Sequence, residues 1–189
     1  MSAPTLPRAG RAPQLDPREY ETSFGEFIGI GPNGNLWVDG CDVAELVERF
    51  GSPLFIMSEN QLRYTYRSFR DAFREHYPNS EILFANKSNN GLAIRHIMNQ
   101  EGAGGDCFGN TEMYLALLAG TDPKTLVLNG SNKEDEELEM AIANGLCINI
   151  DAMDELDRID AVAKRLGKNV DIGIRLALDL DPLADRQGV

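Results

Sequence analysis

A single lysine interrupts the chain just after an apolar run. Residues 82–90 read ILFANKSNN, so Lys87 follows a stretch typical of a buried strand and precedes a polar, turn-prone cluster. Burying an ammonium costs several kcal/mol of free energy unless the charge is paired or the amine takes part in chemistry. A partly desolvated lysine is more readily the neutral amine, which attacks carbonyl carbons to form a Schiff base. The position therefore predicts a nucleophile, acting on a sugar-type carbonyl or on pyridoxal phosphate, rather than a solvated surface charge.

Polar residues stand in the same position after four later apolar stretches. Asp106 follows the second such stretch, Asn129 the third and Asp151 the fourth, while Arg175 lies near the end of the fifth. In a closed barrel of parallel strands, the carboxyl ends of all strands meet at one mouth, where functional residues gather. We therefore expect Lys87 and these four side chains to ring a single mouth.

Strands and helices alternate along the stretches that position these residues. Residues 24–40 (FGEFIGIGPNGNLWVDG) predict a β-hairpin around an Asn33-Gly34 turn. Strands are then expected at 53–58, 81–86, 102–108, 125–130, 146–151 and 170–176. Helices are expected at 43–50, 59–77, about 90–101, about 111–119, from near Glu134, and at about 156–166. Ser131 and Glu134 have the spacing of a capping box for the fifth helix.

This alternation permits an open doubly wound sheet or a (β/α)8 barrel. Because no GxGxxG or P-loop motif follows the first strand, the barrel is favoured over a nucleotide-binding open sheet. Only five barrel strands are present, so we expect an incomplete barrel at 43–189, belonging to a fragment or a truncated form of a longer protein. A β-hairpin from a β-domain is expected at 24–42, and a disordered tail at 1–23.

The composition of the chain limits which classes of partner and which cellular compartment are expected. The formal net charge of −12 argues against nucleic acid as the main partner. No stretch has the length of a membrane span or the apolar region of a signal peptide, so no membrane partner is expected. The three cysteines (Cys41, Cys107 and Cys147) form no CxxC pair, which favours a reducing, cytoplasmic location and gives no zinc motif. The aspartates of 179–185 do not match a calcium loop, so no metal is expected.

The segment around Lys87 resembles a known family. FANKSNN is similar to the YAxKAN motif of the fold-type III pyridoxal-phosphate enzymes, which include alanine racemase and the diaminopimelate, ornithine and arginine decarboxylases. FGSPLFIMSENQLRYTYRSFRDAF resembles the segment yGTPLYVYDEAALR, and GAGGDCFGNTEM resembles GxGFDvaSxgEL. LVLNGSNKEDEELEMAIANGLCINIDAMDELDRI follows the decarboxylase pattern, and IGIRLALDLDP resembles vlLRvNPdvdp. Taken together, the similarity covers about residues 35–182.

The resemblance implies a barrel of the alanine racemase type, a cofactor and residue roles. Lys87 would form the Schiff base with pyridoxal 5'-phosphate and later transfer a proton. Asp106 and Arg175 would lie beside the cofactor ring and the lysine, Glu112 would support the region after the second strand, and Ala85 would leave room for the ring. The implied activity is amino-acid decarboxylation by a homodimer, of the diaminopimelate type because NGSNKEDEEL and INID follow that branch best.

Two departures from the family pattern leave the substrate open. Ser88 stands where the family usually has Ala or Cys, and residues 109–111 read Gly-Asn-Thr rather than Ser-x-Gly. One alternative is a decarboxylase of the ornithine, arginine or carboxynorspermidine type. The other is a non-catalytic homologue that binds pyridoxal phosphate or regulates a decarboxylase.

Overall fold

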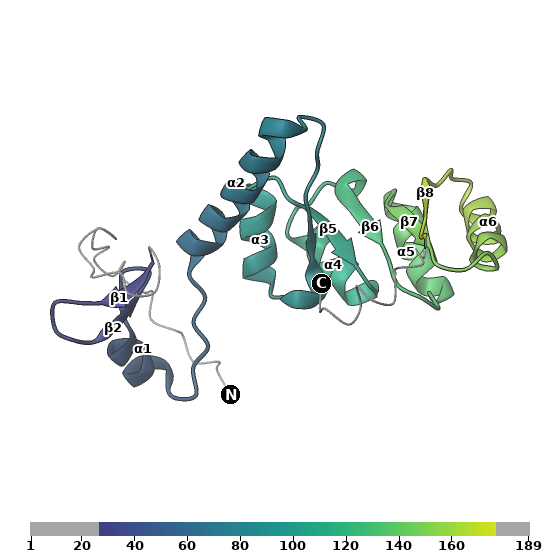
Figure 1. Cartoon of the computed structure of the whole chain (residues 1–189). Coiled ribbons are helices and arrows are strands. Elements are labelled where there is room, and N and C mark those ends of the chain that lie inside the picture. The colour runs from purple at the N-terminus through teal and green to yellow at the C-terminus, as the bar shows by residue number, and fades with distance from the viewer. Residues whose placement is uncertain (1–26, 177–189) are drawn as a thin grey trace, which may run out of the picture. The chain divides into compact units, whose positions relative to one another are not determined.

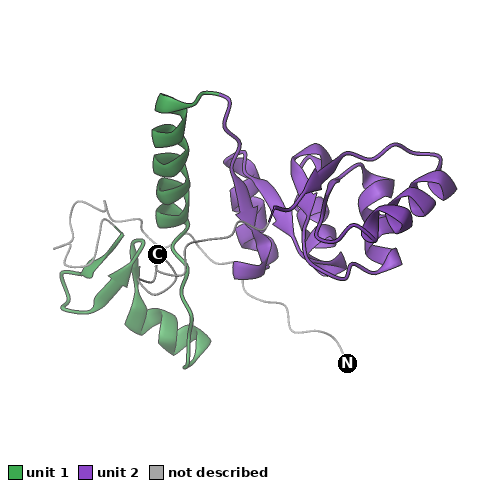
Figure 2. Ribbon diagram, turned by 45° about the vertical axis from the view of Figure 1, so that its right-hand side comes forward, with its two compact units in different colours: residues 1–78 green, residues 79–189 purple. Residues whose placement is uncertain are grey.

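The computed structural model describes residues 27–176, and the chain forms two compact units, residues 1–78 and 79–189 (Figure 2). The expected tail at 1–23 and the aspartates of 179–185 lie outside the described residues. The expected domain boundary after residue 42 stays a prediction.

The first unit begins with the predicted hairpin. Strands β1 (Ile28–Ile30) and β2 (Leu36–Val38) pair antiparallel on either side of Asn33-Gly34, where Gly34 has a φ of +80°. A short third strand, β3 (Cys41–Asp42), pairs with β2 and was not predicted. Helices α1 (Val43–Phe50) and α2 (Glu59–His76) follow, and both agree with the predicted ranges.

Asp42 joins the small sheet to α1. Its carboxylate accepts hydrogen bonds from the side-chain amides of Asn35 and Asn33 at 2.8 and 2.6 Å, and from the backbone N–H of Ala44 at 2.8 Å. The last of these caps the helix N-terminus. These hydrogen bonds, with that of Asn35 the strongest influence, hold the pKa of Asp42 below its ordinary value despite burial.

Residues 53–58 do not form the strand that the sequence predicted. They have no regular secondary structure, and the side chain of Phe55 is 98% exposed. A strand needs a hydrogen-bonded neighbour, and none of the strands within residues 27–176 pairs with this segment. Ser58 instead caps α2, because its hydroxyl accepts the backbone N–H of Gln61 at 3.0 Å.

The second unit is a five-stranded parallel sheet whose strands follow chain order (Figure 1). The strands are β4 (Leu83–Ala85), β5 (Gly104–Cys107), β6 (Leu126–Leu128), β7 (Cys147–Ile150) and β8 (Ile172–Ile174). The connections hold η2 (Asn86–Ser88), α3 (Leu92–Gln100), α4 (Asn110–Leu118), η3 (Pro123–Thr125), α5 (Asp135–Asn144) and α6 (Glu155–Leu166). None of the described helices is long and apolar enough to cross a membrane.

Sequential strand order distinguishes the two architectures that the sequence allowed. Right-handed crossovers that always advance in one direction place every helix on the same face of the sheet. Accordingly α3 packs on α4, α4 on α5, and α5 on α6. A doubly wound sheet has helices on both faces, so the structure confirms the predicted partial barrel.

Alternate residues of the strands face opposite ways. The buried core between sheet and helices includes the strand residues Cys107, Leu126, Leu128, Ile148 and Ile150, and the helix residues Met113, Leu138, Ile142 and Ile159. The opposite face carries Asp106 and Asn149, which are half-buried, and Ala85 lies opposite Asp106 in the strand register. We call this side the inner face, because it corresponds to the interior of a closed barrel.

Candidate functional site

Lys87 lies in η2, immediately after β4, as the strand-end rule predicted. The hydroxyl of Ser88 donates to the carbonyl of Ala85 at 2.7 Å and closes this single turn. The hydroxyl that departs from the family pattern thus has a structural role. The side chain of Lys87 is exposed rather than partly desolvated, because the inner face of the open sheet is accessible to solvent.

Phe108, which the sequence analysis did not select, lies beside the lysine. The Nζ atom of Lys87 is 4.4 Å from the centroid of the Phe108 ring, within the range of a cation–π interaction. The backbone N–H of Phe108 donates to the Glu112 carboxylate at 2.9 Å. Glu112 therefore fixes the loop that carries the ring. An aromatic residue directly after the Asp106-Cys107 strand end was the signal that could have identified this position.

Asp106 belongs to a row of polar side chains across three neighbouring strands. The amide of Asn129 donates to the Asp106 carboxylate, and the amide of Asn149 donates to the Asn129 side-chain oxygen at 2.7 Å. Gly173 in β8 makes this row possible, because a Cβ there would lie 2.0 Å from the Asn149 oxygen. The row holds one carboxylate in a fixed direction on the inner face. Asn149 was not identified from the sequence.

Arg175 lies at the other edge of the sheet. Its Nη1 atom is 3.5 Å from the Asp151 carboxylate, and its side chain is 62% exposed. Lys87 follows β4 and Arg175 follows β8, so the structure holds them on opposite edge strands. Strands separated by four positions face each other across the mouth of a closed eight-stranded barrel.

A buried ion pair supports the loops after β6 and β7. The ammonium of Lys133 lies 3.0 Å from the Glu155 carboxylate and donates to the carbonyl of Gly130 at 2.6 Å. Lys133 is 2% exposed and Glu155 is 5% exposed. The Glu155 carboxylate also accepts the backbone N–H of Asp151 at 2.9 Å. Burial alone would raise the pKa of Glu155, but the hydrogen bonds from Asp151 and Lys133 outweigh it and lower the pKa.

The fifth helix begins near Glu134 as predicted, but its predicted capping box is wrong. The expected capping box joined Ser131 and Glu134, whereas the structure pairs Glu134 with Glu137. The Glu137 carboxylate accepts the backbone N–H of Glu134 at 2.9 Å. Asn132 has a φ of +55° and Lys133 turns into the protein to reach Glu155, so the helix cannot begin before Glu134.

The burial of Cys107 predicts a low reactivity of its thiol in the folded protein. Cys107 is fully buried, and desolvation raises the pKa of its thiol from 9.0 to about 11, although an Asn86 hydrogen bond opposes the change. At pH 8 this leaves about 100-fold less thiolate than the ordinary value would. We expect a thiol reagent to label Cys41 in the folded protein but Cys107 only after unfolding, as peptide mapping by mass spectrometry would show. Rapid labelling of folded Cys107 would contradict this.

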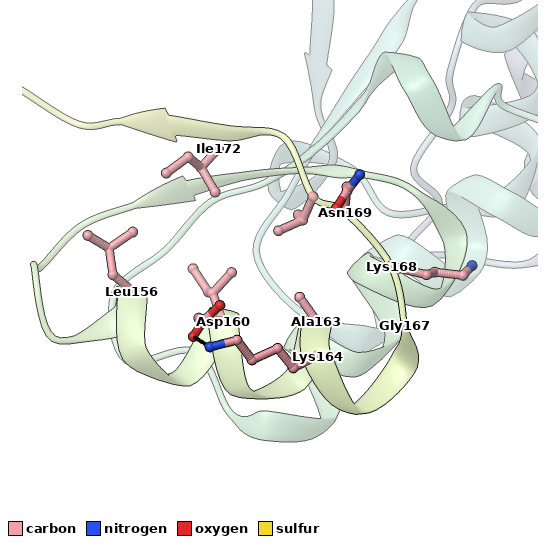
Figure 3. A pocket seen from close by; sticks show the side chains of 10 residues that line it. Leu156, Asp160, Ala163, Lys164, Gly167, Lys168, Asn169 and Ile172 are labelled. Atoms are coloured by element: carbon pink, nitrogen blue, oxygen red, sulfur yellow. Dashed lines mark hydrogen bonds and ion pairs between the residues drawn. The ribbon is translucent and has the colours of Figure 1, made fainter.

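A groove elsewhere in the second unit holds none of the predicted site residues. It lies between α6 and the segment that leads into β8, and its lining includes Leu156, Ala163 and Ile172 (Figure 3). The ammonium of Lys164 pairs with the Asp160 carboxylate at 2.6 Å on its rim. The groove is therefore separate from the strand-end residues described above.

Comparison with known proteins agrees with this geometry. Residues 60–186 match the model of the pyridoxal-dependent decarboxylase family, pyridoxal binding domain. The chain is 37% identical over 150 residues to a diaminopimelate decarboxylase of Archaeoglobus fulgidus, covering 79% of this chain and 35% of that protein. It is 33% identical over 156 residues to the diaminopimelate decarboxylase of Methanothermobacter thermautotrophicus, covering 82% of this chain and 35% of that one.

Solved structures give the same result. The diaminopimelate decarboxylase of Methanocaldococcus jannaschii superimposes with a TM-score of 0.79 at 33% identity, covering 84% of this chain and 38% of that one. The chain belongs to the pyridoxal-dependent decarboxylase family. Within the family, its similarity is to diaminopimelate decarboxylases, of which it spans about a third of the length. These findings confirm the predicted family, fold class and cofactor.

Proposed function

We propose that the protein to which this chain belongs decarboxylates meso-diaminopimelate, with Lys87 as the residue that holds pyridoxal phosphate. The observation that supports this most is the position of Lys87 at the carboxyl end of a barrel strand, in a chain 33–37% identical to diaminopimelate decarboxylases. The M. jannaschii relative was also solved in complex with L-lysine. L-Lysine is diaminopimelate without one carboxyl group, and it is the product that we propose.

The residues around Lys87 fit a flat, anionic aromatic group. Ala85, on the inner face two residues before the lysine, presents only a methyl group. The exposed amine of Lys87 is free of an ion-pair partner among the contacts described for it, and the Phe108 ring lies 4.4 Å away. Arg175 is not among the residues around Lys87, because it follows the opposite edge strand and pairs with Asp151. An aldehyde needs an accessible amine, and this site provides one.

The chain's own residues have separable tasks. When bound, pyridoxal phosphate accepts the electron pair that remains as CO2 leaves the substrate. Lys87 would hold the cofactor through Nζ, and once the substrate amine has taken its place, the freed amine would carry the proton that replaces the lost carboxyl group. Phe108 limits where this amine can lie. Asp106, which accepts from the amide of Asn129, itself held by Asn149, would provide a negative charge of fixed direction to the bound cofactor.

We further propose a cytoplasmic homodimer as the working form. The resemblance to the decarboxylase family supports the dimer, and the three cysteines, which are free in the structure, suit a reducing compartment. The formal net charge of −12 makes nucleic acid an unsuitable partner. The complex of a solved relative with L-lysine supports an amino acid as the substrate.

Release of CO2 from candidate amino acids tests the proposed substrate. We expect the full-length protein with added pyridoxal phosphate to release CO2 from meso-diaminopimelate and form lysine. Ornithine, arginine and carboxynorspermidine would each react at least about 100-fold more slowly, since a site built for a polar group rejects substrates that lack it. Faster release from one of these three would replace the substrate assignment. Cofactor binding without release from any of them would favour a non-catalytic homologue.

A further inference from the structure

The residue next to the proposed attachment lysine points the opposite way. Asn86 is 0% exposed, whereas the side chain of Lys87 is exposed. Both belong to the single turn η2, which spans only Asn86–Ser88. In so short a turn, the direction of one Cα–Cβ bond sets the direction of the next. Whatever holds Asn86 therefore also determines how Lys87 approaches the inner face.

Two buried side chains hold Asn86. Its Nδ2 atom donates to the Sγ atom of Cys107 at 3.0 Å, and its Oδ1 atom accepts from Nη1 of Arg95 at 3.0 Å. Arg95 comes from α3 and is 1% exposed. Because a guanidinium is a rigid planar group, it fixes the plane of the Asn86 amide as well as its position.

The same guanidinium is anchored away from the lysine. Its Nη2 atom donates to the carbonyls of Ala103 and Gly104, both at 3.0 Å, and lies 3.3 Å from the Thr121 hydroxyl. A buried charge is tolerated only where its donors find acceptors, and these contacts provide them. A Cβ at Gly105 would lie 2.7 Å from Leu126 Cδ2 and 3.3 Å from the Asn86 amide nitrogen, so the glycine leaves room beside this arrangement. Arg95 thus connects the backbone at the start of β5 with Asn86 in η2, the turn that carries Lys87.

We propose that Arg95, acting through Asn86, is a positioning residue for Lys87. The proposal rests on the proposed function in one respect, namely that Lys87 holds the cofactor. A purely structural arginine would need only its contacts with the 103–104 carbonyls and Thr121. Arg95 also contacts Asn86, the residue directly before the lysine.

Three variants of the full-length protein separate these roles. Asn86→Ala removes the acceptor for Arg95, and Asn86→Asp keeps an acceptor oxygen at the same place. Thr121→Val is the matched control, because Thr121 is also buried and also contacts Arg95 but lies in a loop without a proposed site residue. Hydrogen exchange of the segment 82–91 is measured without cofactor, and kcat and KM are measured with it.

We expect Asn86→Ala to speed exchange in 82–91 at least about tenfold, since local protection follows local stability. It should lower kcat about 10- to 100-fold with KM within about twofold, as for a misplaced reacting group, while Asn86→Asp and Thr121→Val stay within about threefold. Unchanged exchange in Asn86→Ala, or an equal loss of kcat in Thr121→Val, would overturn the proposal. Absence of a cofactor link at Lys87 would refute the proposed function instead. Exchange would still decide whether Arg95 holds the turn, because both Asn86 variants lose the hydrogen bond to Cys107 but only Asn86→Ala loses the contact with Arg95.

Discussion

Lys87→Ala is expected to remove the near-visible absorption of the bound cofactor and to lower decarboxylation by at least about 10³-fold, within the range for loss of a positioned proton-transfer group. Alanine offers no amine for covalent attachment and no proton for the product carbon. The measurement combines absorption spectroscopy of the full-length protein with CO2 release. Borohydride reduction followed by peptide mass spectrometry then locates the pyridoxyl label, which we expect on Lys87.

Two other variants show whether the amine or only the charge matters. Lys87→Arg keeps a cation beside Phe108 but cannot attach the cofactor, so we expect it to be as inactive as the alanine variant. Lys124 is an exposed lysine in η3, which precedes β6 and so lies at the amino ends of the strands. Lys124→Ala should retain both absorption and activity. A pyridoxyl label on another residue, or an active Lys87→Arg protein, would refute the role proposed for Lys87.

Breaking the buried ion pair should have the largest effect on stability. Either Lys133→Met or Glu155→Gln leaves a buried partner without its counterpart, which typically costs about 3–5 kcal/mol. We expect each to lower the free energy of unfolding by about this amount, measured with denaturant on the full-length protein. The double variant should lose less than the two single losses combined, because the second change removes the unpaired group.

An exposed ion pair between α5 and α6, close to the buried pair in sequence, provides the matched control. Arg158 of α6 contacts Asp135 of α5 at 2.7 Å, but both side chains are largely exposed. Arg158→Ala should therefore change stability much less than Lys133→Met. A similar loss in both variants would mean that burial does not set the strength of the Lys133–Glu155 contact.

The lowered pKa of Glu155 also predicts that the protein loses stability as the pH falls. Because the folded carboxyl has a pKa below its ordinary value of 4.5, the unfolded state binds a proton first as the pH falls. The stability from this pair is thus complete above pH 4.5 and is lost as the pH falls through the folded pKa. In Glu155→Gln this part of the pH dependence should be absent.

The spacing of apolar residues predicted helices α2 and α6, and both form. The spacing of Leu156, Ile159, Val162 and Leu166 predicted α6, and all four are buried or half-buried there. A helical spacing of three and four residues likewise predicted α2 from Leu62, Tyr66, Phe69 and Phe73, yet Phe69 and Phe73 are about half exposed. Periodicity identifies a helix, but it does not show what covers its apolar side.

The candidate site shows a similar limit. Strand-end position and the family motif selected Lys87, but neither could identify Phe108, Arg95 or Glu155. Lys133 and Glu155 lie 22 residues apart, and each looks like a surface charge until folding joins them. The one basic residue in SNKEDEEL was the available signal for Lys133. Partners separated in sequence are visible only once the strand order and register are known.

The sequential strand order has a consequence for how the protein matures. Lys87 and Arg175 follow the two edge strands of the five-stranded sheet, so a chain folded only this far keeps the two cations of the proposed site apart. They can face one substrate only after the sheet has curved round and closed. During refolding, catalytic turnover would then begin only after the barrel has closed. The time at which activity appears would therefore report when closure occurs.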